Sequence, residues 1–272
     1  MRLLFAFLLL FSLPAFAEKE SSYERVMRTG EIRCGYAMSP PNLEKDPNTG
    51  ELYGLEKDIW EELSKELDLK IKWVEEAGWG NYIEGLKTGR YDIFCNQAFP
   101  TPGRVKNTTM ALPVTYQLIY GYVRIDDTRF DDGDFSKVNS EDVTVPGIDG
   151  DVTENMVRSK FPNAKLDLLP QTASVADMFL SVQTKKSDIL FLDKSFFDDY
   201  ERSNPGVLRI VPNTEPVFVY GGRYSFNNGE YGLRDMINIA LGRIIDDGRL
   251  KAMAYNYSEG YFIPPKGYEV PH

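Results

Sequence analysis

Histidine is almost missing from this sequence: the single one, His272, is the last residue. Catalysis by Ser-His-Asp or Cys-His groups requires an imidazole held beside the nucleophile, and many zinc sites use imidazole ligands. These enzyme classes and histidine-ligated metal sites are therefore excluded. We expect no catalytic residues, no metal site and no cofactor.

Long runs of lysine or arginine are also absent. The chain has 31 Lys and Arg against 41 Asp and Glu, which gives a formal net charge of −10 and a pI near 4.8. An acidic protein without a basic stripe has no electrostatic footprint for a polyanion. Nucleic acid is therefore not an expected partner.

The only strongly apolar stretch is the first 17 residues, MRLLFAFLLLFSLPAFA. One positive charge, a short apolar run and a small-residue end are typical of a secretory signal peptide. A membrane anchor is the alternative, but the run is shorter than the roughly 20 residues that span a bilayer. No cysteine follows Ala17, so a lipid anchor is not expected. We expect residues 1–17 to be removed and the mature chain, from Glu18, to be exported as a soluble protein.

Cysteine is scarce, with only Cys34 and Cys95 in the chain. An even count in an oxidising compartment favours a disulfide, and two buried thiols are the alternative. Each cysteine lies in a predicted strand, two residues before the end of that strand. If the two strands are neighbours, the sulfur atoms lie at the same height.

Strand and helix patterns alternate through the first half of the mature chain. Predicted strands at residues 32–36, 70–74 and 91–97 are separated by predicted helices at 55–69 and 82–88. This order indicates a parallel sheet with right-handed crossovers.

The second half has a similar order, reached through an extended crossing at residues 112–123. Its predicted strands are 143–145, 166–169 and 188–192, its predicted helices 153–160 and 174–184. A second extended crossing, 218–223, leads to closing helices at 232–246 and 250–257. Two crossings between two halves indicate two discontinuous lobes with a ligand cleft between them.

Arg104 follows the third predicted strand, in the segment Thr101-Pro102-Gly103-Arg104. Threonine as an N-cap and proline in the first turn start a helix there. Ligands bind at the carboxyl edge of open α/β sheets, and an arginine holds a carboxylate through two parallel hydrogen bonds. An ordinary surface arginine is the alternative, although the positive end of a helix dipole is unfavourable for a cation. We favour a role in binding an anion.

Five motifs in the same order resemble the extracellular solute-binding proteins of family 3, the periplasmic receptors of polar amino-acid transporters. They are GEIRCGY, GLEKDIWEELSKELDL, WGNYIEGLKTGRYDIFCNQAFPTPGR, KSDILFLD and IIDDGRLKAMAYNY. The resemblance covers nearly the whole mature chain. It implies an α/β, two-lobed periplasmic binding protein of type II, with two parallel-core sheets flanked by helices and two hinge crossings.

The resemblance also implies boundaries and partners. The first lobe is expected to comprise residues 18–115 and 222–272, and the second lobe residues 116–221. The ligand is expected to be a small carboxylate-bearing molecule, most often an amino acid. The partner is then an inner-membrane ABC permease, and the receptor itself is expected to be a monomer.

Ligand contacts follow from the same resemblance, position by position. Arg104 falls on the arginine that pairs with the α-carboxylate, and Asp193 on the acid that takes the α-ammonium. Trp79 matches the aromatic that covers the ligand. The other expected contacts are Tyr36, at the end of the first strand, Gln97 and Phe99, which follow the third strand, and Gly150 and Asp151, in the loop PGIDGDVT.

Two departures from the family pattern bear on the ligand. Phe99 replaces the usual Ser or Thr, so one hydroxyl donor is missing. The loop PGIDGDVT carries Asp149 and Asp151 where the family has Gly-Thr. Acids there repel a carboxylate unless they face a cationic group.

The residues themselves leave simpler interpretations open. Asp193 and Asp151 each precede a predicted helix, and both can act as helix caps. Trp79 follows Gly78 in a turn, which favours a ligand contact over a place in the core.

Alternative functions remain open as well. A dehydratase-like periplasmic enzyme of the same fold would use Asp193 or Asp151 as a proton donor with a raised pKa. A receptor could also serve signalling or a neighbouring periplasmic enzyme. We expect a binding protein and not an enzyme.

Overall fold

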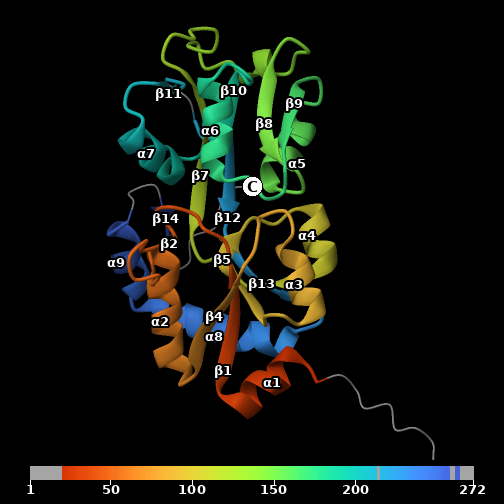
Figure 1. Cartoon of the computed structure of the whole chain (residues 1–272), viewed down its shortest axis with the longest axis vertical. Helices are drawn as coiled ribbons and strands as arrows, with labels where there is room; N and C mark the ends of the chain where they lie inside the picture. The colour runs from red at the N-terminus through yellow and green to blue at the C-terminus, as the bar shows by residue number, and fades with distance from the viewer. Residues whose placement is uncertain (1–19, 213–214, 258–260, 264–272) are drawn as a thin grey trace, which may run out of the picture.

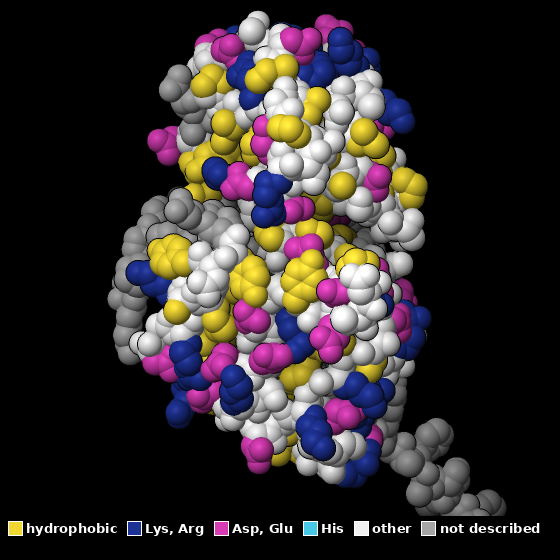
Figure 2. All heavy atoms as spheres, turned by 60° about the vertical axis from the view of Figure 1, so that its left-hand side comes forward, with side chains coloured by type: hydrophobic (Ala, Val, Ile, Leu, Met, Phe, Trp, Pro, Cys, Tyr) yellow, Lys and Arg dark blue, Asp and Glu magenta, His cyan; other side chains and the backbone are white. Residues whose placement is uncertain are grey.

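The computed structural model describes residues 20–212, 215–257 and 261–263 and shows two lobes stacked along the long axis (Figure 1). The expected signal peptide, residues 1–17, lies outside the described residues. Figure 2 shows one face of the molecule, on which Lys and Arg are interspersed with Asp and Glu. The molecule narrows between the lobes in this view. Among the described helices, none is both long enough and apolar enough to cross a membrane.

The first lobe is built on a five-stranded sheet with the order β4-β1-β5-β13-β6. Its strands are β1 (Glu31–Tyr36), β4 (Lys70–Glu76), β5 (Ile93–Ala98), β6 (Thr108–Met110) and β13 (Arg223–Asn227). β1 pairs in parallel with β4 and β5, as the sequence pattern predicts. β13, which returns from the end of the chain, pairs antiparallel with β5 and β6.

Helices cover both faces of this sheet (Figure 1). They are α1 (Ser22–Thr29), α2 (Leu55–Leu67), α3 (Tyr82–Thr88), α4 (Pro102–Asn107), α8 (Tyr231–Asp246) and α9 (Arg249–Tyr255), and a short hairpin of β2 (Glu44–Lys45) and β3 (Leu52–Tyr53) precedes α2. Leu55, Ile59 and Leu63 of the apolar stripe of α2 are buried, and the Trp60 indole donates a hydrogen bond of 3.0 Å to the Cys95 carbonyl. β5 is buried at every residue, as expected for a strand covered on both faces.

The disulfide prediction is confirmed. Cys34 on β1 and Cys95 on β5 are bonded, with their Cα atoms 5.4 Å apart. Because β1 and β5 are neighbours with Cys34 opposite Ile93, the bond ties together the two central strands that lead toward the junction of the lobes.

The second lobe is organised around β7 (Tyr116–Arg124), the long crossing strand. β7 pairs antiparallel with β10 (Ile189–Asp193), β11 (Leu208–Ile210), β12 (Phe218–Gly221) and β14 (Tyr261–Phe262). Only β8 (Thr144–Ile148) and β9 (Lys165–Leu169) pair in parallel there. This differs from the expectation of a second parallel core, because the crossing segment itself becomes the central strand.

Three helices and a 3-10 turn complete the second lobe: η1 (Phe135–Val138), α5 (Val152–Lys160), α6 (Val175–Gln183) and α7 (Lys194–Ser203). The two crossings run side by side, since Tyr116 pairs with Gly221 and the Gly222 amide donates to the Thr115 carbonyl at 2.9 Å. β14 also joins β7 at this point, a pairing that the expected boundary at residue 222 does not anticipate. The division of the chain into lobes by residue number stays a prediction.

Candidate functional site

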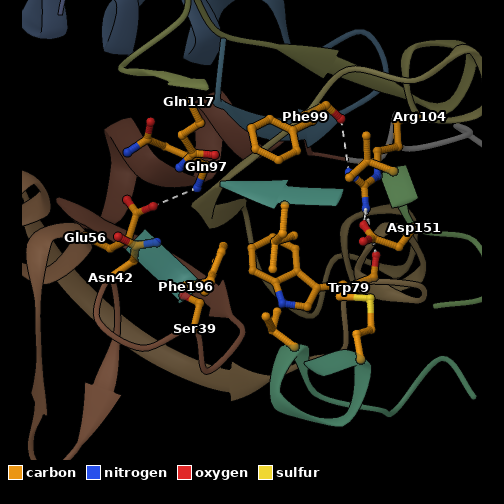
Figure 3. Close-up of a pocket in the computed structure, with 14 residues that line it drawn as sticks. Ser39, Asn42, Glu56, Trp79, Gln97, Phe99, Arg104, Gln117, Asp151 and Phe196 are labelled. Carbon is orange, nitrogen blue, oxygen red and sulfur yellow. Dashed lines mark hydrogen bonds and ion pairs between the residues drawn. The ribbon is translucent and has the colours of Figure 1, made fainter. Parts of the chain in front are cut away.

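A small cavity lies where the two lobes meet (Figure 3). The volume of this cavity is about 40 Å³, which accommodates only a few water molecules. The first lobe contributes polar residues together with Trp79 and Phe99, and the second lobe contributes mainly apolar residues. The lining residues are Ser39, Asn42, Glu56, Trp79, Gln97, Phe99, Arg104, Gln117, Asp151, Val152, Val175, Met178, Leu192 and Phe196.

Arg104 is held rigidly at this cavity. The Thr101 side chain caps α4 by accepting from the Arg104 amide, which fixes the backbone of the residue. The guanidinium donates from Nη1 to the Phe99 carbonyl at 3.0 Å and from Nη2 to the Trp79 carbonyl at 3.1 Å. Arg104 is 3 % exposed, and among the described residues its Nε has no hydrogen-bond partner.

Asp151 meets this guanidinium from the other lobe. Its Oδ1 lies 2.6 Å from Arg104 Nη2 (Figure 3). Asp151 occupies the N-cap position of α5, yet its side chain makes no capping hydrogen bond. The expectation of a helix-capping side chain is therefore wrong, because the buried guanidinium provides a stronger partner for the carboxylate than a backbone amide.

Asp193 has the opposite arrangement. It is the N-cap of α7, and its Oδ1 accepts from the Ser195 amide at 3.0 Å and from the Ser195 hydroxyl. Burial raises the pKa of Asp193 to about 6, and its Oδ2 has no partner within the described part of the chain. The side chain is not among those that line the cavity, although Leu192 and Phe196 on either side of it are. The capping interpretation is confirmed, and the ammonium contact stays a prediction.

Trp79, Gln97 and Phe99 all line the cavity. Trp79 packs edge-on against Phe94, with ring centroids 5.7 Å apart. Gln97 is fixed by its own partners, since its Oε1 accepts from the Thr115 hydroxyl at 2.8 Å and from the Thr115 amide at 3.0 Å. Phe99 offers its carbonyl to Arg104 and its ring to Tyr220, so this position supplies no hydroxyl to the cavity.

Two of the expected contacts, Tyr36 and Gly150, are not among the residues that line the cavity. Tyr36 packs edge-on against Trp73 at 5.7 Å and borders a separate surface groove. Gly150 has φ +78°, a left-handed conformation that favours glycine, and it turns the loop before α5. Gly150 therefore positions Asp151. A direct contact of Tyr36 or Gly150 with a ligand stays a prediction.

Glu56 is a cavity residue that the sequence did not single out. It lies in the first turn of α2. Its Oε1 accepts from the backbone amide of Gln97 at 2.8 Å, and its Oε2 accepts from the Tyr224 hydroxyl at 2.9 Å. Burial raises the pKa of Glu56 to about 7. Glu56 is buried by contacts with β5, which carries Gln97, and with β13, which carries Tyr224.

Ser39, Asn42 and Gln117 were also missed. The Asn42 Oδ1 is buried without a hydrogen-bond partner in the described residues. The Pro40-Pro41 pair before Asn42 was the available signal, because such a pair marks a loop at the end of the first strand, where ligand contacts gather.

The lobes also approach each other beside Trp79 through glycines. A Cβ on Gly80 would lie 2.6 Å from the Asp149 carbonyl, and one on Gly78 would lie 2.8 Å from the Gln171 carbonyl. Asp149 and Gln171 belong to the second lobe, so the absence of two side chains in the first lobe allows this close contact.

The arrangement supports recognition of a small polar molecule. It combines a buried guanidinium, a facing carboxylate, carboxamides and three aromatic rings, those of Trp79, Phe99 and Phe196. In the described part of the chain, no three His, Cys, Asp or Glu side chains are grouped to hold a metal ion. Nothing in the geometry calls for a cofactor.

Solved structures share this fold. The ancestral amino acid-binding protein AncCDT-1, described as a precursor of cyclohexadienyl dehydratase, matches with a TM-score of 0.74 and 23% identity, over 88% of this chain and 99% of its own. A solute receptor for L-cysteine of Neisseria gonorrhoeae matches with a TM-score of 0.72 and 20% identity, over 86% of this chain and 92% of its own. At this level of identity the likeness shows the fold alone.

Sequence comparison gives a closer assignment. A curated relative, a probable amino-acid ABC transporter-binding protein of Haemophilus influenzae (strain ATCC 51907 / DSM 11121 / KW20 / Rd), is 27% identical over 93 residues. The matched stretch is 34% of this chain and 36% of that relative. The family model for bacterial extracellular solute-binding proteins, family 3, matches residues 32–260. The chain therefore belongs to the bacterial extracellular solute-binding proteins of family 3.

Proposed function

We propose that this protein is a periplasmic receptor that encloses an amino acid between its two lobes and delivers it to an ABC permease of the inner membrane. The observation that carries the proposal is Arg104, a buried guanidinium at the junction of the lobes whose Nε has no hydrogen-bond partner among the described residues. The related binding protein and the structural neighbours named for amino acids support the ligand class.

Hinge closure is the mechanism that this geometry favours. The ligand first meets Arg104 and Trp79 on the first lobe, and the second lobe then closes over it. Because the cavity of about 40 Å³ is too small for an amino acid, the lobes have to separate before the ligand enters. The paired crossings at residues 114–117 and 219–222 absorb this rotation, and the preference of the ligand for the closed form sets the population shift.

A thermal-shift screen tests the proposal. The mature protein from Glu18 is heated with each of the twenty L-amino acids and with small organic acids. A ligand at a hundredfold excess over its Kd raises the free energy of unfolding by about 2.7 kcal/mol, and the melting temperature rises accordingly. No shift with any amino acid contradicts the proposed ligand class, and a shift with an organic acid alone redirects it.

An enzyme of the same fold is the second candidate, favoured by two buried acids with raised pKa values, Glu56 and Asp193. Such acids are suitable proton donors. Both oxygens of Glu56 are occupied by donors, however, and Asp193 caps a helix. Mass spectrometry of the ligand after incubation separates the two functions: a receptor returns the ligand unchanged, whereas an enzyme converts it.

A further inference from the structure

The ion pair between Arg104 and Asp151 joins the two lobes directly. Arg104 comes from α4 in the first lobe, and Asp151 from the start of α5 in the second. The two side chains are 3 % and 11 % exposed. The carboxylate thus lies where the family resemblance expects the carboxylate of a ligand.

We propose that Asp151 determines specificity, and that a zwitterionic ligand inserts into this ion pair with its carboxylate on Arg104 and its ammonium group on Asp151. The inference rests on the proposed receptor function. It assigns the ammonium contact to Asp151 and not to Asp193.

Charge pairing is the first argument. A buried ion left without its partner is strongly unfavourable, whereas an ion that exchanges one partner for another is not. A zwitterion replaces one pair by two pairs and leaves no buried charge alone. A simple carboxylate on Arg104 would leave Asp151 unpaired, and a simple amine on Asp151 would leave Arg104 unpaired.

The geometry of the guanidinium is the second argument. Nε and Nη2 form one edge of the fork, which matches the two oxygens of a carboxylate. Asp151 uses this edge only at Nη2, and among the described residues Nε has no acceptor although it is buried. A ligand carboxylate that accepts from both nitrogens supplies the missing hydrogen bond, so it competes well with Asp151.

The surroundings of the two aspartates are the third argument. Asp151 lines the cavity and makes no capping hydrogen bond; apart from Arg104, its carboxylate accepts among the described residues only a long hydrogen bond of 3.5 Å from the Thr153 hydroxyl. Asp193 does not line the cavity, and one of its oxygens is engaged by Ser195. Glu56, the other acid at the cavity, already accepts a hydrogen bond at each oxygen. Asp151 is therefore the carboxylate best placed for an ammonium group.

Calorimetry with three matched ligands tests the inference. The amino acid that binds best is compared with its deaminated acid and its decarboxylated amine; for arginine these are δ-guanidinovaleric acid and agmatine. The wild-type protein should bind the amino acid at least a hundredfold more tightly than either analogue. Asp151→Asn should reduce the preference over the deaminated acid to below tenfold, because no buried acid then loses its partner.

Two further variants, Asp149→Asn and Asp193→Asn, test whether the effect is particular to Asp151. Asp149→Asn removes the same charge two residues away, on an exposed side chain that accepts from Gln171 at 3.0 Å, and should keep the full preference. Asp193→Asn examines the rival assignment and should keep it too. Asp151→Ser, which retains a good N-cap residue, replaces Asp151→Asn if the latter does not fold.

The outcomes separate the inference from the proposed function. If the wild-type protein binds no amino acid, the proposed function and the inference both fail. If it binds an amino acid but Asp151→Asn keeps the hundredfold preference, only the inference is overturned. Loss of the preference in Asp193→Asn alone would assign the ammonium contact to that residue and would also overturn it.

Discussion

Two helices of the second lobe begin in the same way and end up with different tasks. α5 and α7 each follow a strand or its turn, and each has an aspartate in extended conformation at its N-cap. Asp193 accepts hydrogen bonds from its own helix, whereas Asp151 leaves its helix uncapped and contacts Arg104 of the first lobe. The same residue type at the same helix position can thus serve either local structure or contact between lobes.

The difference depends on what lies opposite each helix end. The N-terminus of a helix favours a carboxylate whether or not the side chain caps it, because the helix dipole is positive there. At α5 a buried guanidinium lies within 2.6 Å, and a charge-assisted bond to it is stronger than a neutral cap. Asp193 accepts from Ser195 of its own helix, and its Oδ2 has no hydrogen-bond partner in the described residues. Local sequence favours the acid, and the facing lobe decides its use.

Of the changes that test this difference, removal of the Arg104 guanidinium should have the largest effect. Arg104→Ala leaves Asp151 without its partner and removes the anchor for a ligand carboxylate, so ligand affinity should fall by about 3–5 kcal/mol. Titration calorimetry measures the loss. Arg104→Lys, which keeps the charge but not the two-pronged edge, should fall between the wild-type protein and Arg104→Ala. Micromolar binding of the same ligand by Arg104→Ala would contradict the carboxylate clamp.

Asp193→Asn should have an effect of intermediate size, which appears in the pH dependence of the free energy of unfolding. The pKa of Asp193 is about 6 when folded, against 3.8 ordinarily, so the folded protein holds this proton more tightly than the unfolded chain. The stability that this proton contributes is present below pH 4 and is lost as the pH rises through 6. Asp193→Asn removes the loss, so from pH 4 to pH 7.5 the variant should gain roughly 2–3 kcal/mol relative to the wild-type protein.

Urea unfolding at the two pH values measures this difference. Other acids titrate in both proteins and cancel in the comparison. Parallel pH profiles for the two proteins would show that burial does not perturb Asp193 as described.

Gly80→Ala should have the smallest effect, on closure alone. Its Cβ would meet the Asp149 carbonyl at 2.6 Å in the closed form, and such overpacking costs about 1–3 kcal/mol. The ligand-free protein should become more open by small-angle X-ray scattering, and ligand affinity should fall. Gly103→Ala is the matched control, because the nearest atom to its Cβ would be 3.9 Å away. Equal behaviour of the two variants would show that this contact does not limit closure.

Much of the first lobe could be predicted from the sequence. The alternation of strands and helices predicted the parallel pairing of β1 with β4 and β5, and the structure shows that the strands of Cys34 and Cys95 are neighbours. Thr101 and Pro102 located the start of α4 and therefore Arg104. These predictions succeeded because caps, turns and periodicity act over a few residues.

Other features required contacts between distant segments. The antiparallel sheet around β7 could not be read from periodicity, because pairing partners leave no local signal. Glu56 is buried partly because it contacts Tyr224 of β13, which lies 168 residues away along the chain.

For this protein, the sequence by itself determined the parallel strand-helix pattern of the first lobe, the place of Arg104 and the presence of aspartates at the starts of two helices. Only the tertiary structure decided which aspartate faces the arginine. Helix capping is a local interaction, written in neighbouring residues. An ion pair between lobes depends on where two surfaces from distant parts of the chain meet, as Arg104 and Asp151 do at 2.6 Å.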